Sequence, residues 1–361
     1  MGQRFRRLPE RCLLIALTAL LLACGAEDPA PSRAEPAAPV PDTIEQLDTK
    51  AAPPVAAQSP PGDIPAGPGW WSVLPRPEWQ DFTRRTTLNP WFDVYEVQQN
   101  IFALYESGQQ AENISWLIIG RIQALLFDTG TGMGDIRSVV KQLTKKPVLV
   151  LNSSSHYANV GGNHQFTEIM ALNLPRVRER AGGIPRSEIG QYATGDALWK
   201  TAPANFNALD YAIKPWEFAR WVQSGQLLDL GGLRLEIVHI PGYRPDSLML
   251  LDRRNRRLFT GDSFSLGTID LTHAASDVLL FADAAALLSD IADDVDLLMM
   301  GQRVPLAESR FLGDLDQAMQ RILDGSAAFK STNGQRQYAF TGFSIVTPDP
   351  PLADAAVIDL L

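Results

Sequence analysis

The stretch from Val148 to Phe166, VLVLNSSSHYANVGGNHQF, constrains the fold of this chain more than any other. Its first four residues, Val148 to Leu151, are apolar and are typical of a buried parallel strand. A polar loop begins at Asn152, and two glycines then permit a tight turn before Asn163, the expected cap of a following helix. Because α/β proteins place their chemistry where a strand ends in a loop before a helix, we expect the functional site here.

Residues 1–23 are expected to be a signal peptide rather than part of the fold. Four arginines precede an apolar run, Cys12 to Leu22, that is too short to span a bilayer. The run ends in Leu-Leu-Ala-Cys24, which resembles the lipobox of bacterial lipoproteins. The resemblance implies cleavage before Cys24 and a lipid on its thiol, which anchors the protein in the cell envelope facing the periplasm, with Gly25 slightly favouring the outer membrane. A plain secretory signal or an uncleaved anchor is the alternative.

The composition narrows the choice of partners. Removal of residues 1–23 changes the 32 basic and 41 acidic residues to 28 and 40, so the mature chain has a net charge of −12. An acidic body without a basic block argues against nucleic acid as a partner. Cys12 leaves with the signal peptide and Cys24 carries the lipid, so no thiol remains for a disulfide or a metal.

The rest of the chain divides into three segments, the second of which contains an insertion. Residues 24–68 are rich in Pro and Ala and predict a disordered tether. Residues 69–347 form the folded body, in which a strand, a helix and a strand between 124 and 151 make a βαβ unit. Residues 170–226 contain three tryptophans and are interpreted as an irregular, partly helical insertion over the cleft. The tail, 348–361, is either loose or a short docked helix.

The predicted strands are short β-type runs separated by turns. They lie at 94–97, 101–105, 114–119, 124–127, 148–151, 227–228, 233–240, 247–251, 257–260, 295–300 and within 337–346. The spacing of apolar residues predicts helices at 136–143, about 279–291 and 311–323.

The loop and four other segments resemble the metallo-β-lactamase superfamily. The family loop reads Asn-Thr/Ser-His-x-His-x-Asp-His-x-Gly-Gly-Asn, and residues 152–163 of this chain read NSSSHYANVGGN. The other segments, in family order, are ALLFDTG at 124–130, LEIVHIPGYRPDS at 235–247, LFTGD at 258–262 and MMGQRVP at 299–305. The resemblance covers roughly residues 90–347 and implies an α/β fold, a four-layer αββα sandwich.

The resemblance also implies where metal ligands would stand. Of the seven ligand positions, only His156 and Asp262 keep a ligand residue type. Five others are replaced, by Ser154, Ala158, Asn159, Tyr243 and Gln302. Two supporting positions are kept: Asp128, which braces the metal loop in the family, and His239, the non-ligand histidine of the His-Thr-Pro-Gly-His-Thr-Pro segment.

This donor set predicts at most a weak metal site. A catalytic zinc takes three protein ligands, which His156 and Asp262 alone do not provide. Ser154, Asn159 and Gln302 carry neutral oxygens, which hold zinc poorly, and Tyr243 ligates only as a phenolate. We therefore expect no tightly bound cofactor. Zinc or another divalent cation held weakly by His156 and Asp262 is the alternative.

Metal-free chemistry is a further possibility. His156 and Asp262 are the candidate catalytic residues, as a hydrogen-bonded acid–base pair. Ser154 and Ser155 beside His156 suggest a nucleophile with a base, although no Gly-x-Ser-x-Gly elbow surrounds them.

The other histidines are expected to play lesser parts. His164 is predicted to be a surface residue. His239 is predicted to be a buried residue at a strand end, bonded to backbone. His273 lies near Asp270 in a loop that borders the cleft.

Three functions follow as hypotheses. The first is a membrane-anchored, non-catalytic pseudoenzyme whose cleft binds a small ligand or an envelope protein. The second is a hydrolase of lactone, ester, thioester or β-lactam type with a rebuilt or mononuclear site. The third is an envelope scaffold that uses residues 170–226 as its contact surface.

Overall fold

The structure is a computed structural model that describes residues 70–351. The predicted signal peptide, Cys24, the tether and residues 352–361 lie outside the described residues. Within the described part, no helix is both long and apolar enough to cross a bilayer.

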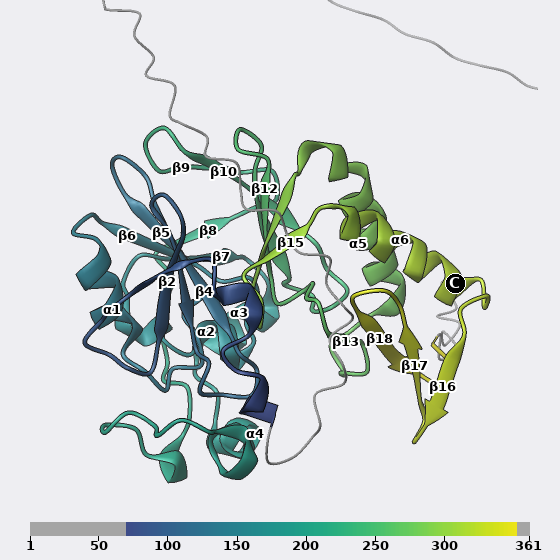
Figure 1. Ribbon diagram of the computed structural model, residues 1–361, viewed down its shortest axis with the longest axis horizontal. Coiled ribbons are helices and arrows are strands. Elements are labelled where there is room, and N and C mark those ends of the chain that lie inside the picture. Colours follow the sequence, from purple (N-terminus) through teal and green to yellow (C-terminus); the bar gives the residue numbers. More distant parts are fainter. Residues whose placement is uncertain (1–69, 352–361) are drawn as a thin grey trace, which may run out of the picture. The chain divides into compact units, whose positions relative to one another are not determined.

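Two large sheets form the centre of the fold (Figure 1). The first has eight strands in sequence order: β1 (Thr83–Arg85), β2 (Asp93–Gln98), β3 (Ile101–Tyr105), β4 (Ile114–Ile119), β5 (Ala124–Phe127), β6 (Val148–Leu151), β7 (Ile169–Leu172) and β8 (Arg220–Val222). Its strands are antiparallel up to β5, and β5 to β8 are parallel.

The second sheet has six strands in the order β15, β14, β12, β11, β10, β9. Their bounds are β9 (Leu227–Asp229), β10 (Arg234–His239), β11 (Leu248–Asp252), β12 (Arg257–Gly261), β14 (Leu297–Met300) and β15 (Leu306–Glu308). A third, four-stranded sheet contains β13 (Thr268–Asp270), β16 (Phe329–Thr332), β17 (Gln335–Ala339) and β18 (Ser344–Pro348).

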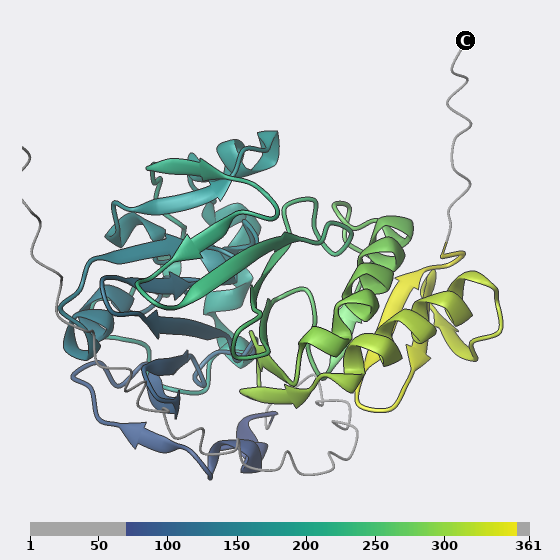
Figure 2. The ribbon, with the colours of Figure 1, turned by 90° about the horizontal axis from the view of Figure 1, so that it is seen from above.

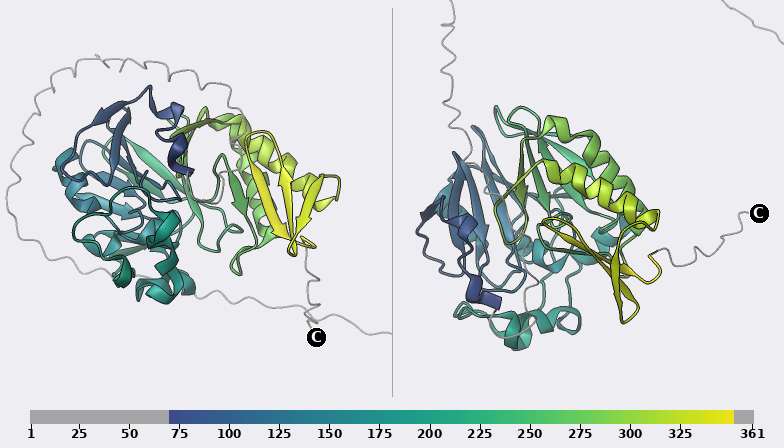
Figure 3. Two further views of the ribbon diagram at one scale, coloured as in Figure 1. Left: turned by 60° about the horizontal axis from the view of Figure 1, so that its bottom comes forward. Right: turned by 45° about the vertical axis from the view of Figure 1, so that its right-hand side comes forward.

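Helices cover the outer faces of the two large sheets (Figure 2). The helices are α1 (Ile136–Leu143), α2 (Tyr157–Val160), α3 (Pro175–Ala181), α4 (Arg186–Ile189), α5 (Val278–Asp290) and α6 (Arg310–Leu323). Seven short 3-10 helices accompany them, at Trp70–Val73, Pro77–Trp79, Asn163–Gln165, Gly190–Ala193, Gly195–Ala197, Ala208–Asp210 and Ala292–Asp294. Helices α5 and α6 lie side by side against the second sheet and the small sheet (Figure 3).

The strand β4 shows how the sequence produces these layers. Successive side chains of a strand point to opposite faces. Accordingly, Ile114, Trp116 and Ile118 pack between the two large sheets, whereas Leu117 faces the layer that contains α1. Trp116 meets Phe259 of the second sheet edge to face, with ring centroids 5.8 Å apart. The predicted αββα sandwich is confirmed: one core cluster lies between the two large sheets, and two others lie between the sheets and the outer helices.

Most predicted elements match the observed ones within a few residues, but the helix expected after Asn163 is wrong. A four-residue helix, α2, precedes the two glycines, and only a 3-10 turn follows them. The Asn163 side chain does not cap a helix: its Oδ1 accepts from Thr129 Oγ1 at 2.8 Å, and its Nδ2 donates to Asn152 Oδ1 at 2.9 Å. The residue thus fixes the loop rather than starting a helix.

The segment 170–226 is more regular at its ends than predicted. It begins in β7 and ends in β8, which extend the first sheet, and it contains α3, α4 and short 3-10 helices between them. Strands as short as β8, with three residues, are too brief for a visible alternation of apolar side chains. The same reason explains why β1, β13 and β15 were not predicted.

Candidate functional site

The loop after β6 is held in place by Asp128 at the end of β5. The carboxylate of Asp128 accepts from the backbone N–H of Ser153 at 2.6 Å and from Ser153 Oγ at 2.8 Å. Asp128 itself has a φ of 68°, a left-handed conformation that is uncommon for a residue other than glycine. Burial, with the nearby Asp262 charge, raises the pKa of Asp128 well above its ordinary value. The bracing role that the resemblance implied therefore corresponds to two hydrogen bonds.

The second carboxylate, Asp262, follows directly after β12. Its neighbour Gly261 has a φ of 57°, and a Cβ there would lie 2.1 Å from the Cβ of Ser153, so only glycine allows the two loops to approach this closely. Asp262 accepts from Ser154 Oγ at 2.9 Å and, more weakly, from Ser153 Oγ at 3.5 Å. Burial raises the pKa of Asp262, and the Arg244 charge opposes this rise.

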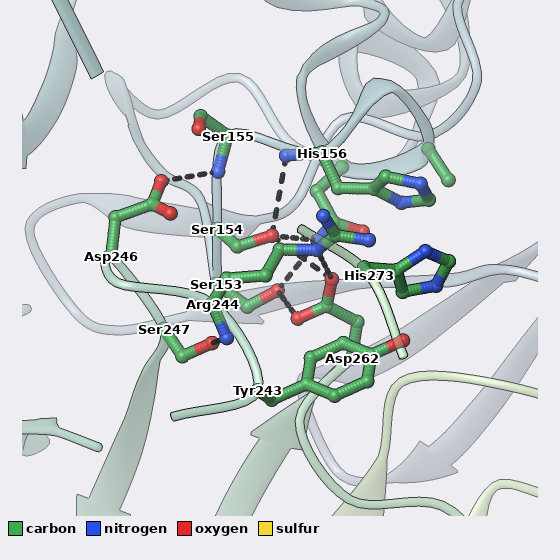
Figure 4. Close-up of polar contacts among 12 residues, drawn as sticks. Ser153, Ser154, Ser155, His156, Tyr243, Arg244, Asp246, Ser247, Asp262 and His273 are labelled. Carbon is green, nitrogen blue, oxygen red and sulfur yellow. Dashed lines mark hydrogen bonds and ion pairs between the residues drawn. The ribbon is translucent and has the colours of Figure 1, made fainter. Parts of the chain in front are cut away.

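Ser154 has every hydrogen-bonding position of its hydroxyl engaged. Its Oγ donates to Asp262 and accepts from Asn159 Nδ2 at 2.9 Å and from the backbone N–H of His156 at 3.2 Å. Asn159 also donates to Ser153 Oγ at 3.1 Å. Two of the residues that replace family ligands, Ser154 and Asn159, thus form a hydrogen-bond network with Asp262. Figure 4 shows the Ser154 hydroxyl beside the Asp262 carboxylate.

Arg244 is the site residue that sequence analysis missed. Its Nε lies 3.7 Å from Asp262 Oδ2, and the two side chains are 8% and 2% exposed. In Figure 4 the guanidinium lies between the imidazole of His156 and the carboxylate of Asp262. A signal was present in the sequence, because an arginine stands here where the family segment His-Thr-Pro-Gly-His-Thr-Pro has its second threonine.

Tyr243 contacts this arginine. The Arg244 Cζ lies 5.3 Å from the centroid of the Tyr243 ring, within cation–π range. Burial, and then the negative charge of Asp262, raises the pKa of Tyr243 to about 12. The phenol is therefore protonated at neutral pH.

His156 does not form the predicted acid–base pair with Asp262. Its Nδ1 is buried without a hydrogen-bond partner, and its ring meets Tyr157 at a centroid distance of 4.4 Å. Burial, followed by the charge of Arg244 and then by His273, Arg180 and Arg176, lowers the pKa of His156 well below its ordinary value. The imidazole is therefore neutral at pH 7.

Ala158, Gln302 and His239 lie apart from the Asp262 network, and His273 borders it. Ala158 is buried in the apolar layer, and its carbonyl accepts from Asn113 Nδ2 at 2.8 Å. Gln302 forms a backbone bridge with Asn113. His239 is half-buried rather than buried, and its Nε2 lies 2.8 Å from the carbonyl oxygen of Pro245, which confirms the expected bond to backbone. His273 borders the network in Figure 4, with Nε2 3.8 Å from Asp270 Oδ2.

The donors around Asp262 do not fit a metal. Across residues 70–351, no cluster of three or more His, Cys, Asp or Glu side chains is arranged to hold an ion. The oxygens of Asp128 are used by Ser153, and the side chain beside Asp262 is a guanidinium, which carries no lone pair for coordination. A cation placed here would also face the charge of Arg244.

The comparisons with known proteins agree with this architecture. The chain is 26% identical to a human protein named acyl-coenzyme A thioesterase MBLAC2 over 181 residues, which are 47% of this chain and 62% of that protein. The relative of the same name in Gallus gallus is 25% identical over 185 residues, 48% of this chain and 65% of that protein. The chain therefore spans less than two thirds of the length of these relatives.

A solved structure supports the fold alone. The sec-alkylsulfatase Pisa1 from Pseudomonas sp. has a TM-score of 0.50 and 18% identity, covering 64% of this chain and 42% of its own. The family model described as the metallo-beta-lactamase superfamily matches residues 113–302, more than half of the chain. The chain belongs to the metallo-beta-lactamase superfamily.

Proposed function

We propose that this chain is a lipid-anchored, non-catalytic binding protein that uses the metallo-beta-lactamase fold without a metal. The observation that carries this proposal is the buried ion pair of Arg244 with Asp262. The guanidinium supplies the positive charge that a divalent ion would otherwise present to the carboxylate. A charge buried without a partner is costly, so the arginine makes the fold independent of a metal ion.

The contacts of Ser154 favour a structural role for this serine over a role as a nucleophile. Attack requires a hydroxyl with a lone pair directed at the substrate and a base to take the proton. Ser154 accepts two hydrogen bonds from Asn159 and His156 and is 3% exposed. The neutral His156 has no hydrogen bond to it through the ring. These contacts support a structural role for Ser154.

The expected ligand is a small molecule or a protein of the cell envelope. The net charge of −9 for the whole chain supports neither nucleic acid nor another polyanion as a partner. A lipid on Cys24 would hold the body at the membrane, in the envelope and facing the periplasm.

Turnover by the purified protein tests the proposal. The substrates are an acyl thioester, a lactone, a β-lactam and a simple ester, each assayed with zinc added and with a chelator. We expect no hydrolysis above the protein-free rate in either condition. Hydrolysis that disappears in the chelator would overturn the proposal.

A thioester hydrolase is the second candidate, since the two curated relatives carry acyl-coenzyme A thioesterase in their names. In a metal-free version, Asp262 would accept the Ser154 proton across their 2.9 Å hydrogen bond. Ser154→Ala would then abolish thioesterase activity, whereas Ser155→Ala, a matched change of the next buried serine, would leave it. If the protein is a non-catalytic binding protein, thioester hydrolysis stays at the protein-free rate for wild type and for both variants.

The anchor has its own test. Cys24→Ser in the full chain should move the protein from the membrane fraction to the soluble fraction and should remove labelling by a fatty-acid analogue. Cys12→Ser, in the expected signal peptide, is the matched control and should leave both unchanged. Membrane association of the Cys24→Ser variant would contradict the anchor.

A further inference from the structure

A small cavity lies behind the loop that carries Ser154 and Ser155. Its volume is about 20 Å³, and its walls include Val177, Leu248 and Trp216 as well as Ser155 and Asp246. This is enough for one water-sized group, since a buried water needs at least about 10–15 Å³. Ser154, which belongs to the Asp262 network, also lines this cavity.

Two polar side chains that line the cavity each have one unpaired atom. Asp246, 3% exposed, uses Oδ2 to accept from the backbone N–H of Ser155 at 2.6 Å (Figure 4), while its Oδ1 has no partner. Trp216 is 7% exposed, and its Nε1 also has no partner. The cavity therefore offers one acceptor and one donor, and leaving either unpaired in a buried place costs free energy.

A hydroxyl is the group whose chemistry suits both atoms. A hydroxyl donates one hydrogen bond and accepts others, so it matches a carboxylate oxygen and an indole N–H at the same time. A carboxylate would face repulsion from Asp246, and an ammonium has no lone pair for the indole N–H. An alkyl group would leave both polar atoms unsatisfied.

Apolar side chains line part of the cavity, and a surface groove shares one of these residues with it. Half-buried Phe218 lines the cavity, and its ring lies 4.9 Å from the ring of Trp221, which is 42% exposed. Trp221 lines a surface groove of about 470 Å³, and Leu172 belongs to the walls of both the groove and the cavity. An apolar chain attached to the buried hydroxyl would have these aromatic rings to lie against.

The geometry points to a binding site for an aliphatic alcohol, with its hydroxyl between Asp246 and Trp216 and its chain along Phe218 and Trp221. This inference deepens the proposed function by naming the class of ligand. Asp246 also accepts a hydrogen bond from the backbone N–H of Ser155. The carboxylate that would bind the hydroxyl therefore also contacts the loop after β6.

The experiment is an NMR titration of the full protein with 15N-labelled tryptophan, using 1-butanol and 1-hexanol as ligands. We expect the Trp216 indole N–H signal, assigned from Trp216→Phe, to shift and saturate. The affinity should rise about fourfold for each added methylene, the factor that corresponds to burying one CH₂. Hexane, which lacks the hydroxyl, should not move the signal.

Two variants keep the test decisive. Asp246→Asn, which retains the size of the side chain, should weaken hexanol binding about tenfold, as expected for the loss of a hydrogen bond to a charged group. Trp199→Phe, which changes a tryptophan that lines neither the cavity nor the groove, is the matched control and should leave hexanol binding unchanged. Equal binding by wild type and Asp246→Asn, or a crystal structure in which a water on both atoms is not displaced by hexanol, would overturn the inference. Failure of the alcohol site would not contradict the proposed metal-free binding protein, because that proposal is tested by the zinc content and by the hydrolysis assays.

Discussion

The Nε of Arg244 lies 3.7 Å from Oδ2 of Asp262, and the two side chains are almost completely buried. This distance makes an ion pair without a hydrogen bond, in agreement with the lack of any hydrogen-bond partner at Arg244 Nε. The pair stands where the family resemblance places a metal beside the same aspartate. In the proposed metal-free account, the guanidinium of Arg244 takes the place of the metal ion beside Asp262.

Removing the arginine should be costly. Arg244→Ala leaves the Asp262 carboxylate buried beside Asp128 with no positive partner, so we expect a loss of about 3–5 kcal/mol in the free energy of unfolding, measured in urea. Arg253→Ala is the control, since Arg253 pairs with Glu236 and Asp294 at the surface and should cost less than about 1 kcal/mol. Adding Asp262→Asn to Arg244→Ala should recover part of the loss. Similar costs for Arg244→Ala and Arg253→Ala would mean that the pair does not compensate the buried charge.

Stability should fall below about pH 6.5 because of His156. Its pKa is lowered on folding, so the unfolded chain binds the proton more tightly, and the stabilisation present above pH 6.5 is lost as the pH falls toward the folded pKa. Asp128 and Asp262, whose pKa values are raised, titrate in the opposite sense: their contribution is present below about pH 4 and is lost at higher pH.

The difference in the free energy of unfolding between wild type and His156→Gln reports the contribution of this histidine. We expect this difference to change by up to about 1.4 kcal/mol per pH unit below pH 6.5, measured by urea unfolding at several pH values. A flat difference would mean that the imidazole of His156 is not buried in the neutral form.

Restoring the family ligands should fail while Arg244 remains. The five changes are Ser154→His, Ala158→Asp, Asn159→His, Tyr243→His and Gln302→His. With Arg244 present, its charge opposes any cation beside Asp262, so we expect only weak zinc binding. Adding Arg244→Thr, the residue type of the family segment, should raise the zinc affinity by at least a hundredfold in competition with a chromogenic chelator. Arg253→Thr, added to the same five changes, is the control. An equal gain in zinc affinity from both variants would mean that the charge of Arg244 does not oppose zinc binding.

Much of the fold was predictable because the apolar runs in the sequence and the resemblance to the family predict the same strands. The strands of the sandwich are short apolar runs, and Gly261 and Asp262 stand at the end of one of them. Asp128 was expected to brace the loop, and its two bonds to Ser153 provide that brace. These features depend on residues near in sequence or on backbone shapes that only certain residue types adopt.

The centre of the site was not predictable in the same way. The family resemblance predicts Tyr243 as a site residue, because it occupies a ligand position. The residue that lies beside Asp262 is its neighbour Arg244. Which of two adjacent side chains points inward depends on tertiary packing, and the ring of His156 turns toward Tyr157 for the same reason. The role of Asn163 was also misjudged, since its partners Thr129 and Asn152 come from two different strand ends.

The zinc content of the purified full-length protein is the most direct test of the central claim. The protein would be dialysed against excess zinc, separated from free metal, and measured by mass spectrometry with the protein concentration determined independently. The metal-free account predicts well below one zinc per chain. Two zinc ions per chain, retained through the separation, would contradict it.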